Sequence, residues 1–261
     1  MKIITTILFI LLTSCADGKT SYIGSTPANP TIKTFLGIPL SDPIDFIRWE
    51  FVNGGRQYAV ICTYGISKPN TNGFIDPKKI DIRGKLTKEG NYYRLYHDNK
   101  TILLAIFNAH VLHFANADKS FMTGTGGWSY GLYSTGAALP SDIKPKLITL
   151  KDSMEFHGRT PCKEFSNQGL QVSPNCYKLK WSVVLYAAKG KPTTYKTRGT
   201  AFRNAEPKTG KWYFKNGMGW IDGGDHRLYF IMPGENIILF TDAKWNLLQG
   251  DLDFGYTLNR K

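Results

Sequence analysis

The stretch VLHFANADKSFMTGTGGWSYGLY, residues 111–133, returns in altered form as IILFTDAKWNLLQGDLDFGYTLN, residues 237–259. The two stretches align without gaps at a constant offset of 126 residues. The identical pairs are Phe114 with Phe240, Ala117 with Ala243, Gly124 with Gly250, Tyr130 with Tyr256 and Leu132 with Leu258. Self-similarity at a fixed spacing is typical of a repeated structural unit. The chain is therefore predicted to contain two copies of one domain.

Shorter matches continue the repeat upstream, in the same order but at shifted registers, as loop insertions would produce. They are Phe35-x-Gly37 with Phe156-x-Gly158, Arg48-Trp49 with Lys180-Trp181, Arg83-Gly84 with Arg198-Gly199, and Arg94-Leu95-Tyr96 with Arg227-Leu228-Tyr229. We predict a first domain over residues 33–137 and a second domain over residues 148–261. The proline-containing segment ALPSDIKPKL, residues 138–147, is the predicted linker.

Strands dominate the predicted secondary structure. Aromatic and β-branched runs bounded by Gly, Pro or Asn are typical of strands, whereas no segment keeps a helical period over several turns. The clearest runs are residues 56–64, 177–187, 193–202 and 227–232. Closely spaced strands with glycine-rich turns favour barrels or sandwiches over a parallel α/β sheet. The predicted fold is all-β, with two tandem small antiparallel β-barrels.

The N-terminus has the features of an export signal. Lys2 is followed by an apolar run and then by small residues, a pattern typical of a secretory signal peptide and too short for a membrane-spanning helix. Leu12-Thr13-Ser14-Cys15 resembles the lipobox of bacterial lipoproteins, in which the signal is removed before a cysteine that carries the lipid. The alternative is an ordinary signal peptide with a chance cysteine. We predict a signal peptide over residues 1–14 and lipidation at Cys15.

The segment after the predicted lipid anchor is rich in Ser, Thr, Pro, Gly and Asn and lacks an apolar period. Such composition is typical of a flexible connection, so residues 15–32 are predicted to be the anchor and its tether. No second stretch of about 20 apolar residues follows. The remainder is expected to be water-soluble and held at a membrane by its acyl chains, each buried methylene of which contributes about 0.8 kcal/mol.

The chain is strongly basic, with a formal net charge of +13. A basic surface is either simply solvated or has affinity for anionic lipid headgroups, envelope polymers or nucleic acid. Export argues against a nucleic-acid partner, and the chain has neither a dense Lys/Arg run nor a nucleic-acid-binding motif. The predicted partners are the membrane and an envelope protein or glycan.

Gly127-Trp128-Ser129-Tyr130-Gly131 matches the G-x-S-x-G pattern of a hydrolase nucleophile elbow, with Ser129 as the nucleophile. The repeat provides a control, because Ser129 aligns with Gly255 in the second copy. A nucleophile elbow needs a sharp turn from a strand into a helix, and no helix start follows Gly131. The alternation of Trp128, Tyr130 and Leu132 instead predicts a half-buried strand. We therefore reject the hydrolase interpretation.

Cys162 and Cys176 enclose one loop of the second copy. In an exported protein such a pair is expected to form a disulfide, and closing a loop of about 15 residues contributes about 3 kcal/mol. The alternative is a soft-metal site with His157 nearby and a methionine as a further ligand. Cys62 lies in an apolar run and is predicted to be a buried thiol.

No motif indicates catalysis or a metal centre. His110 and His113 would face opposite sides of a strand, and the repeat places Leu239 at the position of His113, which favours a packing role. The carboxylates Asp222, Asp225, Asp251 and Asp253 are scattered and would form an acid pair only by accident of folding. The protein is therefore predicted not to be an enzyme and to have no catalytic residue, metal site or cofactor.

Aromatic residues are abundant, with 6 Trp, 14 Tyr and 15 Phe. Most of them are expected in the barrel cores, and exposed ones could form a platform for sugars or apolar ligands.

The second copy also resembles a known family. It combines Gly158-Arg159-Thr160-Pro161-Cys162, Gly199-Thr200, Gly210-Lys211-Trp212 and the ending Phe254-Gly255-Tyr256-Thr257-Leu258. Residues 154–261 thereby resemble the N-terminal domain of NlpE-type lipoproteins, which are lipid-anchored, lipocalin-like barrels associated with copper homeostasis and envelope stress. The family has a second cysteine three positions after the first, but Lys163-Glu164-Phe165 follows Cys162 here. The resemblance therefore implies the fold more than the copper chemistry.

Together these features predict a monomeric, lipid-anchored protein of the bacterial outer membrane, on its periplasmic or surface face, that acts by binding or sensing. The alternative is a lipocalin-like carrier of a small apolar or metal ligand. A lumen filled by side chains would favour the first function, and an open aromatic-lined lumen would favour the second.

Overall fold

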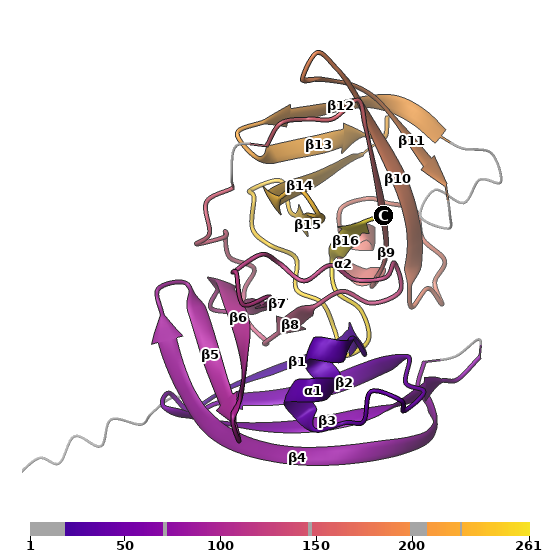
Figure 1. Cartoon of the computed structure of the whole chain (residues 1–261). Coiled ribbons are helices and arrows are strands. Elements are labelled where there is room, and N and C mark those ends of the chain that lie inside the picture. Colours follow the sequence, from indigo (N-terminus) through magenta and orange to yellow (C-terminus); the bar gives the residue numbers. More distant parts are fainter. Residues whose placement is uncertain (1–18, 70–71, 146–147, 199–207, 225) are drawn as a thin grey trace, which may run out of the picture.

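The computed structural model describes residues 19–261 except residues 70–71, 146–147, 199–207 and 225. It contains two closed antiparallel barrels in tandem, each of eight strands in sequential order (Figure 1). The prediction of an all-β fold with two tandem small β-barrels is confirmed. The predicted signal peptide, residues 1–14, and Cys15 lie outside the described residues.

The first barrel consists of β1 (Thr20–Pro27), β2 (Phe46–Asn53), β3 (Gln57–Ser67), β4 (Phe74–Glu89), β5 (Tyr92–His97), β6 (Lys100–Asn108), β7 (Val111–Ala115) and β8 (Gly131–Tyr133). The second consists of β9 (Ser153–Thr160), β10 (Leu179–Ala188), β11 (Lys191–Arg198), β12 (Lys208–Lys215), β13 (Met218–Asp222), β14 (Arg227–Gly234), β15 (Ile237–Thr241) and β16 (Thr257–Arg260). Two short helices, α1 (Pro30–Leu36) and α2 (Lys163–Asn167), follow the first strand of each barrel.

The prediction that residues 15–32 form a flexible tether is wrong for residues 20–27, which form strand β1. Residues 20–27 pair along their whole length with β2, so the first barrel begins at Thr20 and not at residue 33. Tyr22, Gly24 and Thr26 face inward and are buried. The Ser/Thr/Pro-rich composition concealed this strand, because Gly, Ser and Pro are interspersed with its Tyr, Ile and Thr and are equally typical of a flexible connection.

The counterpart of β1 is β9, which shares a four-residue pattern with it: Gly24-Ser25-Thr26-Pro27 matches Gly158-Arg159-Thr160-Pro161. The indole of Trp49 donates to Thr26 Oγ1 at 2.9 Å, and that of Trp181 donates to Thr160 Oγ1 at 2.8 Å. The predicted match of Arg48-Trp49 with Lys180-Trp181 is therefore confirmed. The shared pattern was the sequence signal that marked the true start of the first barrel.

Three of the four upstream sequence matches are wrong. The first of these is the match of Arg83-Gly84 with Arg198-Gly199. Gly84, rather than pairing with Gly199, corresponds to Gly210 at the same offset of 126 residues. A Cβ atom on Gly84 would lie 2.8 Å from the ring of Tyr58, and one on Gly210 would lie 2.7 Å from the ring of Tyr195. Each glycine is therefore required by the tyrosine of the neighbouring strand.

The other two mismatches place residues on unlike elements. Leu95 lies on the fifth strand of its barrel and Leu228 on the sixth strand of the other. Phe35 lies in α1, whereas Phe156 lies in β9. Short matches without a fixed spacing are therefore weaker guides than the constant offset.

The two barrels share a buried apolar cluster between them, and Figure 1 shows β7 and β8 next to the second barrel. The fully buried members of the cluster are Ala105, Phe107, Val111, Tyr133, Ile231, Ile237, Leu239 and Leu247. They come from the outer faces of strands in both barrels and from one loop of the second barrel. The barrels therefore form one packed molecule.

Two equivalent loops extend the contact reciprocally. The 242–256 loop of the second barrel reaches the first, where Leu252 O accepts from Ser25 Oγ at 2.6 Å and Asp253 Oδ1 accepts from Arg48 Nε at 3.0 Å. The 116–130 loop of the first barrel reaches the second, where Gly124 N donates to Asn259 Oδ1 at 2.7 Å. The contact between the barrels is thus approximately two-fold symmetric, in keeping with the sequence repeat.

Candidate functional site

Both barrel lumens are filled by side chains. In the first barrel Trp49, Phe51 and Phe114 are buried in the central cluster, beneath Phe35 of α1. In the second barrel Phe165 of α2 packs against Trp181, Phe240 and Tyr256, with ring centroids 4.9–5.2 Å apart. The aromatic residues thus serve mainly as core, and each helix closes one end of a barrel. A lumen of this kind leaves little room for a carried ligand.

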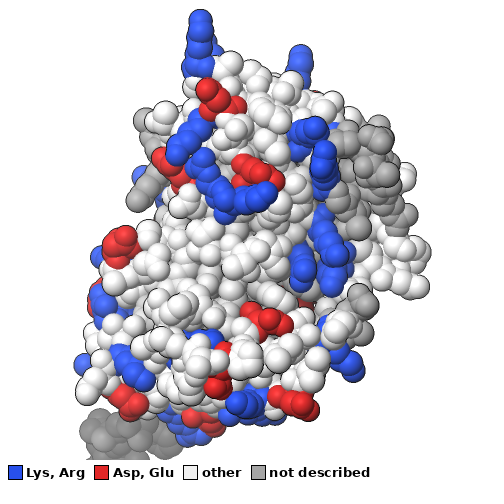
Figure 2. All heavy atoms as spheres, turned by 45° about the vertical axis from the view of Figure 1, so that its right-hand side comes forward, with Lys and Arg blue, Asp and Glu red and all other residues white. Residues whose placement is uncertain are grey.

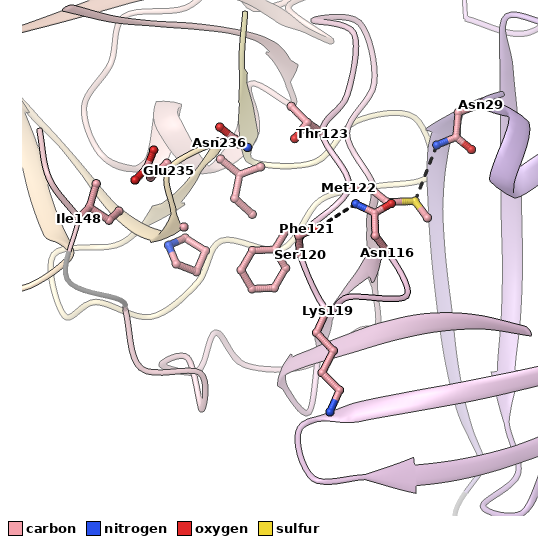
Figure 3. Close-up of a pocket in the computed structure, with 13 residues that line it drawn as sticks. Asn29, Asn116, Lys119, Ser120, Phe121, Met122, Thr123, Ile148, Glu235 and Asn236 are labelled. Atoms are coloured by element: carbon pink, nitrogen blue, oxygen red, sulfur yellow. Dashed lines mark hydrogen bonds between the residues drawn. The ribbon is translucent and has the colours of Figure 1, made fainter. Parts of the chain in front are cut away.

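A groove of about 670 Å³ lies instead between the barrels (Figure 3). One wall is formed by residues 119–123 of the 116–130 loop, and the other by residues 233–237 at the turn between β14 and β15. Phe121 lies in the middle of the lining, with Ile148 and Glu235 on one side and Asn116 on the other. A volume of this size lies within the range of ligand-binding sites.

The rim of the groove is polar and its floor is partly apolar. Asn29 at the start of α1 donates from Nδ2 to the sulfur of Met122 at 3.8 Å. Lys119 points away from the groove toward the first barrel, where its ammonium lies 5.3 Å from the ring of Tyr92. Glu235 is half-exposed and 3.8 Å from Arg260. These groups can hydrogen-bond a polar ligand, but none of them is paired as a nucleophile with a base.

Ser129 is a buried residue of the contact between the barrels. Strand β8, not a helix, begins two residues after it, which agrees with our rejection of a nucleophile elbow. The predicted half-buried strand through Trp128 and Tyr130 is wrong: only Gly131 of the pentapeptide lies in β8, Ser129 and Tyr130 are buried before the strand begins, and Trp128 stacks on Phe46 at 4.4 Å. The guanidinium of Arg159 lies 5.4 Å above the same indole. The pentapeptide therefore joins the barrels.

The predicted disulfide is present. Cys162 and Cys176 are bonded, with their Cα atoms 6.0 Å apart, and they close the loop that contains α2. The alternative metal site is wrong for this state, since both sulfurs are bonded and His157 Nε2 lies 2.6 Å from Glu155 Oε1 instead. Cys62 is a buried free thiol, as predicted, and burial raises its pKa well above the usual value.

The two spaced histidines have separate roles. His113 is fully buried between the barrels, where its Nε2 lies 2.9 Å from Met122 O, and burial lowers its pKa to about 4. His110 Nδ1 lies 2.8 Å from Ser134 Oγ. The predicted packing role of His113 is confirmed. Among the described residues no three His, Cys, Asp or Glu side chains are grouped to hold a metal ion.

The scattered carboxylates serve turns and the contact between the barrels. Asp222 ends β13 and accepts from Gly224 N at 3.2 Å. Asp251 accepts from the amides of Asp253 and Phe254, each at 2.8 Å, and burial raises the pKa of its carboxyl. Asp253 pairs with Arg48 of the first barrel. Asp225 lies outside the described residues.

A second candidate surface is an aromatic row on the outside of the second barrel. Tyr213, Trp220 and Tyr229 are direct cross-strand neighbours on β12, β13 and β14. The rings of Tyr213 and Trp220 stack at 4.7 Å, Tyr213 is 40% exposed, and a shallow groove of about 590 Å³ adjoins them. Figure 2 shows Lys and Arg side chains gathered over this barrel. Sequence reasoning anticipated exposed aromatics but could not identify them.

Comparisons with known protein families, curated proteins and solved structures found no match. No helix in the described part of the chain is long and apolar enough to cross a membrane.

Proposed function

We propose that this protein is a lipid-anchored component of a bacterial cell envelope, attached through Cys15 to the outer membrane, that acts by binding or sensing without catalysis. The observation that carries the binding role is the contrast between two filled lumens and an accessible groove between the barrels. A filled lumen disfavours the alternative, a lipocalin-like carrier. The resemblance of residues 154–261 to NlpE-type lipoproteins and the export signal support the location.

The anchor is tested by Cys15→Ser in the full chain expressed in a bacterium. Lipidated protein is expected in the membrane fraction, and Cys15→Ser is expected to accumulate as precursor or in the soluble fraction. Acyl chains on a single residue provide most of the membrane affinity, so their loss should be visible by fractionation and by mass. Cys62→Ser serves as the matched control. Unchanged membrane partitioning of Cys15→Ser would contradict the anchor.

A glycan partner is the second candidate, favoured by the aromatic row of the second barrel. Stacked, partly exposed rings flanked by lysines suit the apolar face of a sugar and the anionic groups of envelope polymers.

A further inference from the structure

The approximate two-fold symmetry relates the open groove to a second groove on the other side of the contact. We call the groove between residues 119–123 and 233–237 the open groove. At the offset of 126 residues its walls correspond to residues 245–249 and 107–111, which enclose what we call the closed groove. The two grooves therefore have equivalent walls, and their contents can be compared.

The closed groove is occupied by the chain's own linker. Leu139 O accepts from Leu247 N at 2.8 Å and from Asn108 Nδ2 at 2.8 Å. Pro140 forms an isolated antiparallel bridge with Asn246, and Gln249 Nε2 donates to Ala137 O at 3.1 Å. Residues 137–140 thus lie across this groove as an extended segment, held by main-chain and amide hydrogen bonds, and the chain bends at residues 142–143.

The open groove has an equivalent main-chain N–H donor, but no described segment of the chain lies across it as the linker lies across the closed groove. Phe121 corresponds to Leu247, and each forms one isolated bridge to its own barrel, with Ala115 and Thr241 respectively. Leu247 is 1% exposed beneath the linker, whereas Phe121 is partly exposed. Phe121 N–H has no hydrogen-bond partner among the described residues, although its counterpart donates to the linker.

One wall residue differs in a way that widens the open groove. Gly234 stands where the closed groove has Asn108, the residue whose amide donates to Leu139 O. A Cβ atom on Gly234 would lie 3.5 Å from the ring of Phe121, an ordinary van der Waals contact, so the first atom of a side chain is accommodated there. The open groove therefore offers more room and one amide donor fewer.

We propose that the open groove binds an extended, proline-containing segment of a partner polypeptide, in the manner of residues 137–140 in the closed groove. The segment accepts a hydrogen bond from Phe121 N–H and packs an apolar side chain against Phe121. Main-chain pairing of this kind supplies affinity that depends little on sequence, while the side-chain contacts supply selectivity. The proposal specifies the ligand of the binding role proposed above and does not depend on the lipid anchor.

The test uses the folded chain from residue 16 onward and a fluorescein-labelled peptide of residues 138–143, ALPSDI. Fluorescence anisotropy is expected to show saturable binding. The Gly234→Asn variant restores the amide donor and should bind about threefold to tenfold more tightly, the range for one hydrogen bond. Gly190→Asn, at a turn with open space around it, is the matched control and should leave the affinity unchanged.

Amide hydrogen exchange locates the binding. The peptide should slow exchange at Phe121 N–H in both the wild type and Gly234→Asn. The proposal is wrong if neither folded protein binds the peptide at 1 mM, or if binding leaves Phe121 exchange unchanged. It is equally wrong if an oligosaccharide or an apolar dye protects Phe121 while the peptide does not. None of these outcomes bears on Cys15, so the anchor and the groove can fail separately.

Discussion

Gly124 and Gly250 are identical in the two copies because each lies beneath a side chain of the opposite barrel. A Cβ atom on Gly124 would lie 2.0 Å from Trp128 O and 2.9 Å from the amide of Asn259. A Cβ atom on Gly250 would lie 2.5 Å from both Phe254 O and the ring of Tyr133. The identity noticed in the sequence therefore preserves close contacts between the barrels.

Gly124→Ala should destabilise the folded protein by at least about 2 kcal/mol, because the added methyl overlaps backbone atoms in a packed contact. Urea unfolding of the purified chain measures this change. Gly127→Ala, in the same loop, is the matched control. Its Cβ atom would lie 3.6 Å from Arg159, so we expect a change within about 0.5 kcal/mol. Equal effects of the two substitutions would contradict the close approach at Gly124.

Strands β7 and β15 show how one element serves two cores. All 5 residues of each strand are buried. Leu112 and Phe114 of β7 point into their own barrel, whereas Val111 packs in the shared cluster between the barrels. His113 lies on the same face as Val111, and its counterpart Leu239 is a member of that cluster. A polar residue thus occupies a site that the second copy fills with an apolar one.

His113 should make stability depend on pH. Its pKa is about 4 in the folded protein and about 6.5 when unfolded, so the unfolded chain binds more protons between these values. The free energy of unfolding is therefore not reduced by His113 above pH 6.5, and it falls as the pH is lowered toward 4, because protonation of His113 favours the unfolded chain. The surrounding rings of Phe107, Phe121 and Tyr130 leave the imidazolium without a counter-charge.

Lowering the pH from 7 to 5 should reduce the free energy of unfolding of the wild type by about 2 kcal/mol more than that of His113→Leu. Urea unfolding at the two pH values measures the difference. His110→Gln is the control and should retain the wild-type dependence. A parallel loss in wild type and His113→Leu would show that His113 does not titrate in this range.

The sequence was sufficient for the strand-rich class, because the period of apolar residues is a local property, and for the equivalence of the two copies where they align at the constant offset of 126 residues. It was not sufficient for β1, whose Gly, Ser, Thr and Pro suit either a tether or a strand until Trp49 provides the partner of Thr26. The disulfide could be predicted because Cys162 and Cys176 enclose one short loop. The open groove could not, since Phe121 and Gly234 are far apart in the sequence and meet only through the packing of two barrels.

At the scale of the whole molecule, the sequence predicted two separate domains connected by a linker, but in the structure the two barrels pack against each other through a shared apolar cluster. Apolar positions such as Val111 and Ile237 have the same period whether they face a lumen or a neighbouring barrel, so their partner could not be predicted. The shared cluster and the reciprocal loops make the stability of each barrel depend on the other. Coupled domains with a large apolar contact are expected to unfold together.

We therefore predict one calorimetric transition, with equal calorimetric and van't Hoff enthalpies. Cys162→Ser combined with Cys176→Ser opens the loop closed by two cysteines 14 positions apart, which removes about 3 kcal/mol and should lower the single transition by about 6–12 °C. Gly250→Ala loosens the contact between the barrels and should split the single transition into two. Only the transition of the second barrel should then respond to loss of the disulfide. Two transitions in the unmodified protein, with one insensitive to the disulfide, would mean that the barrels fold independently despite the cluster between them.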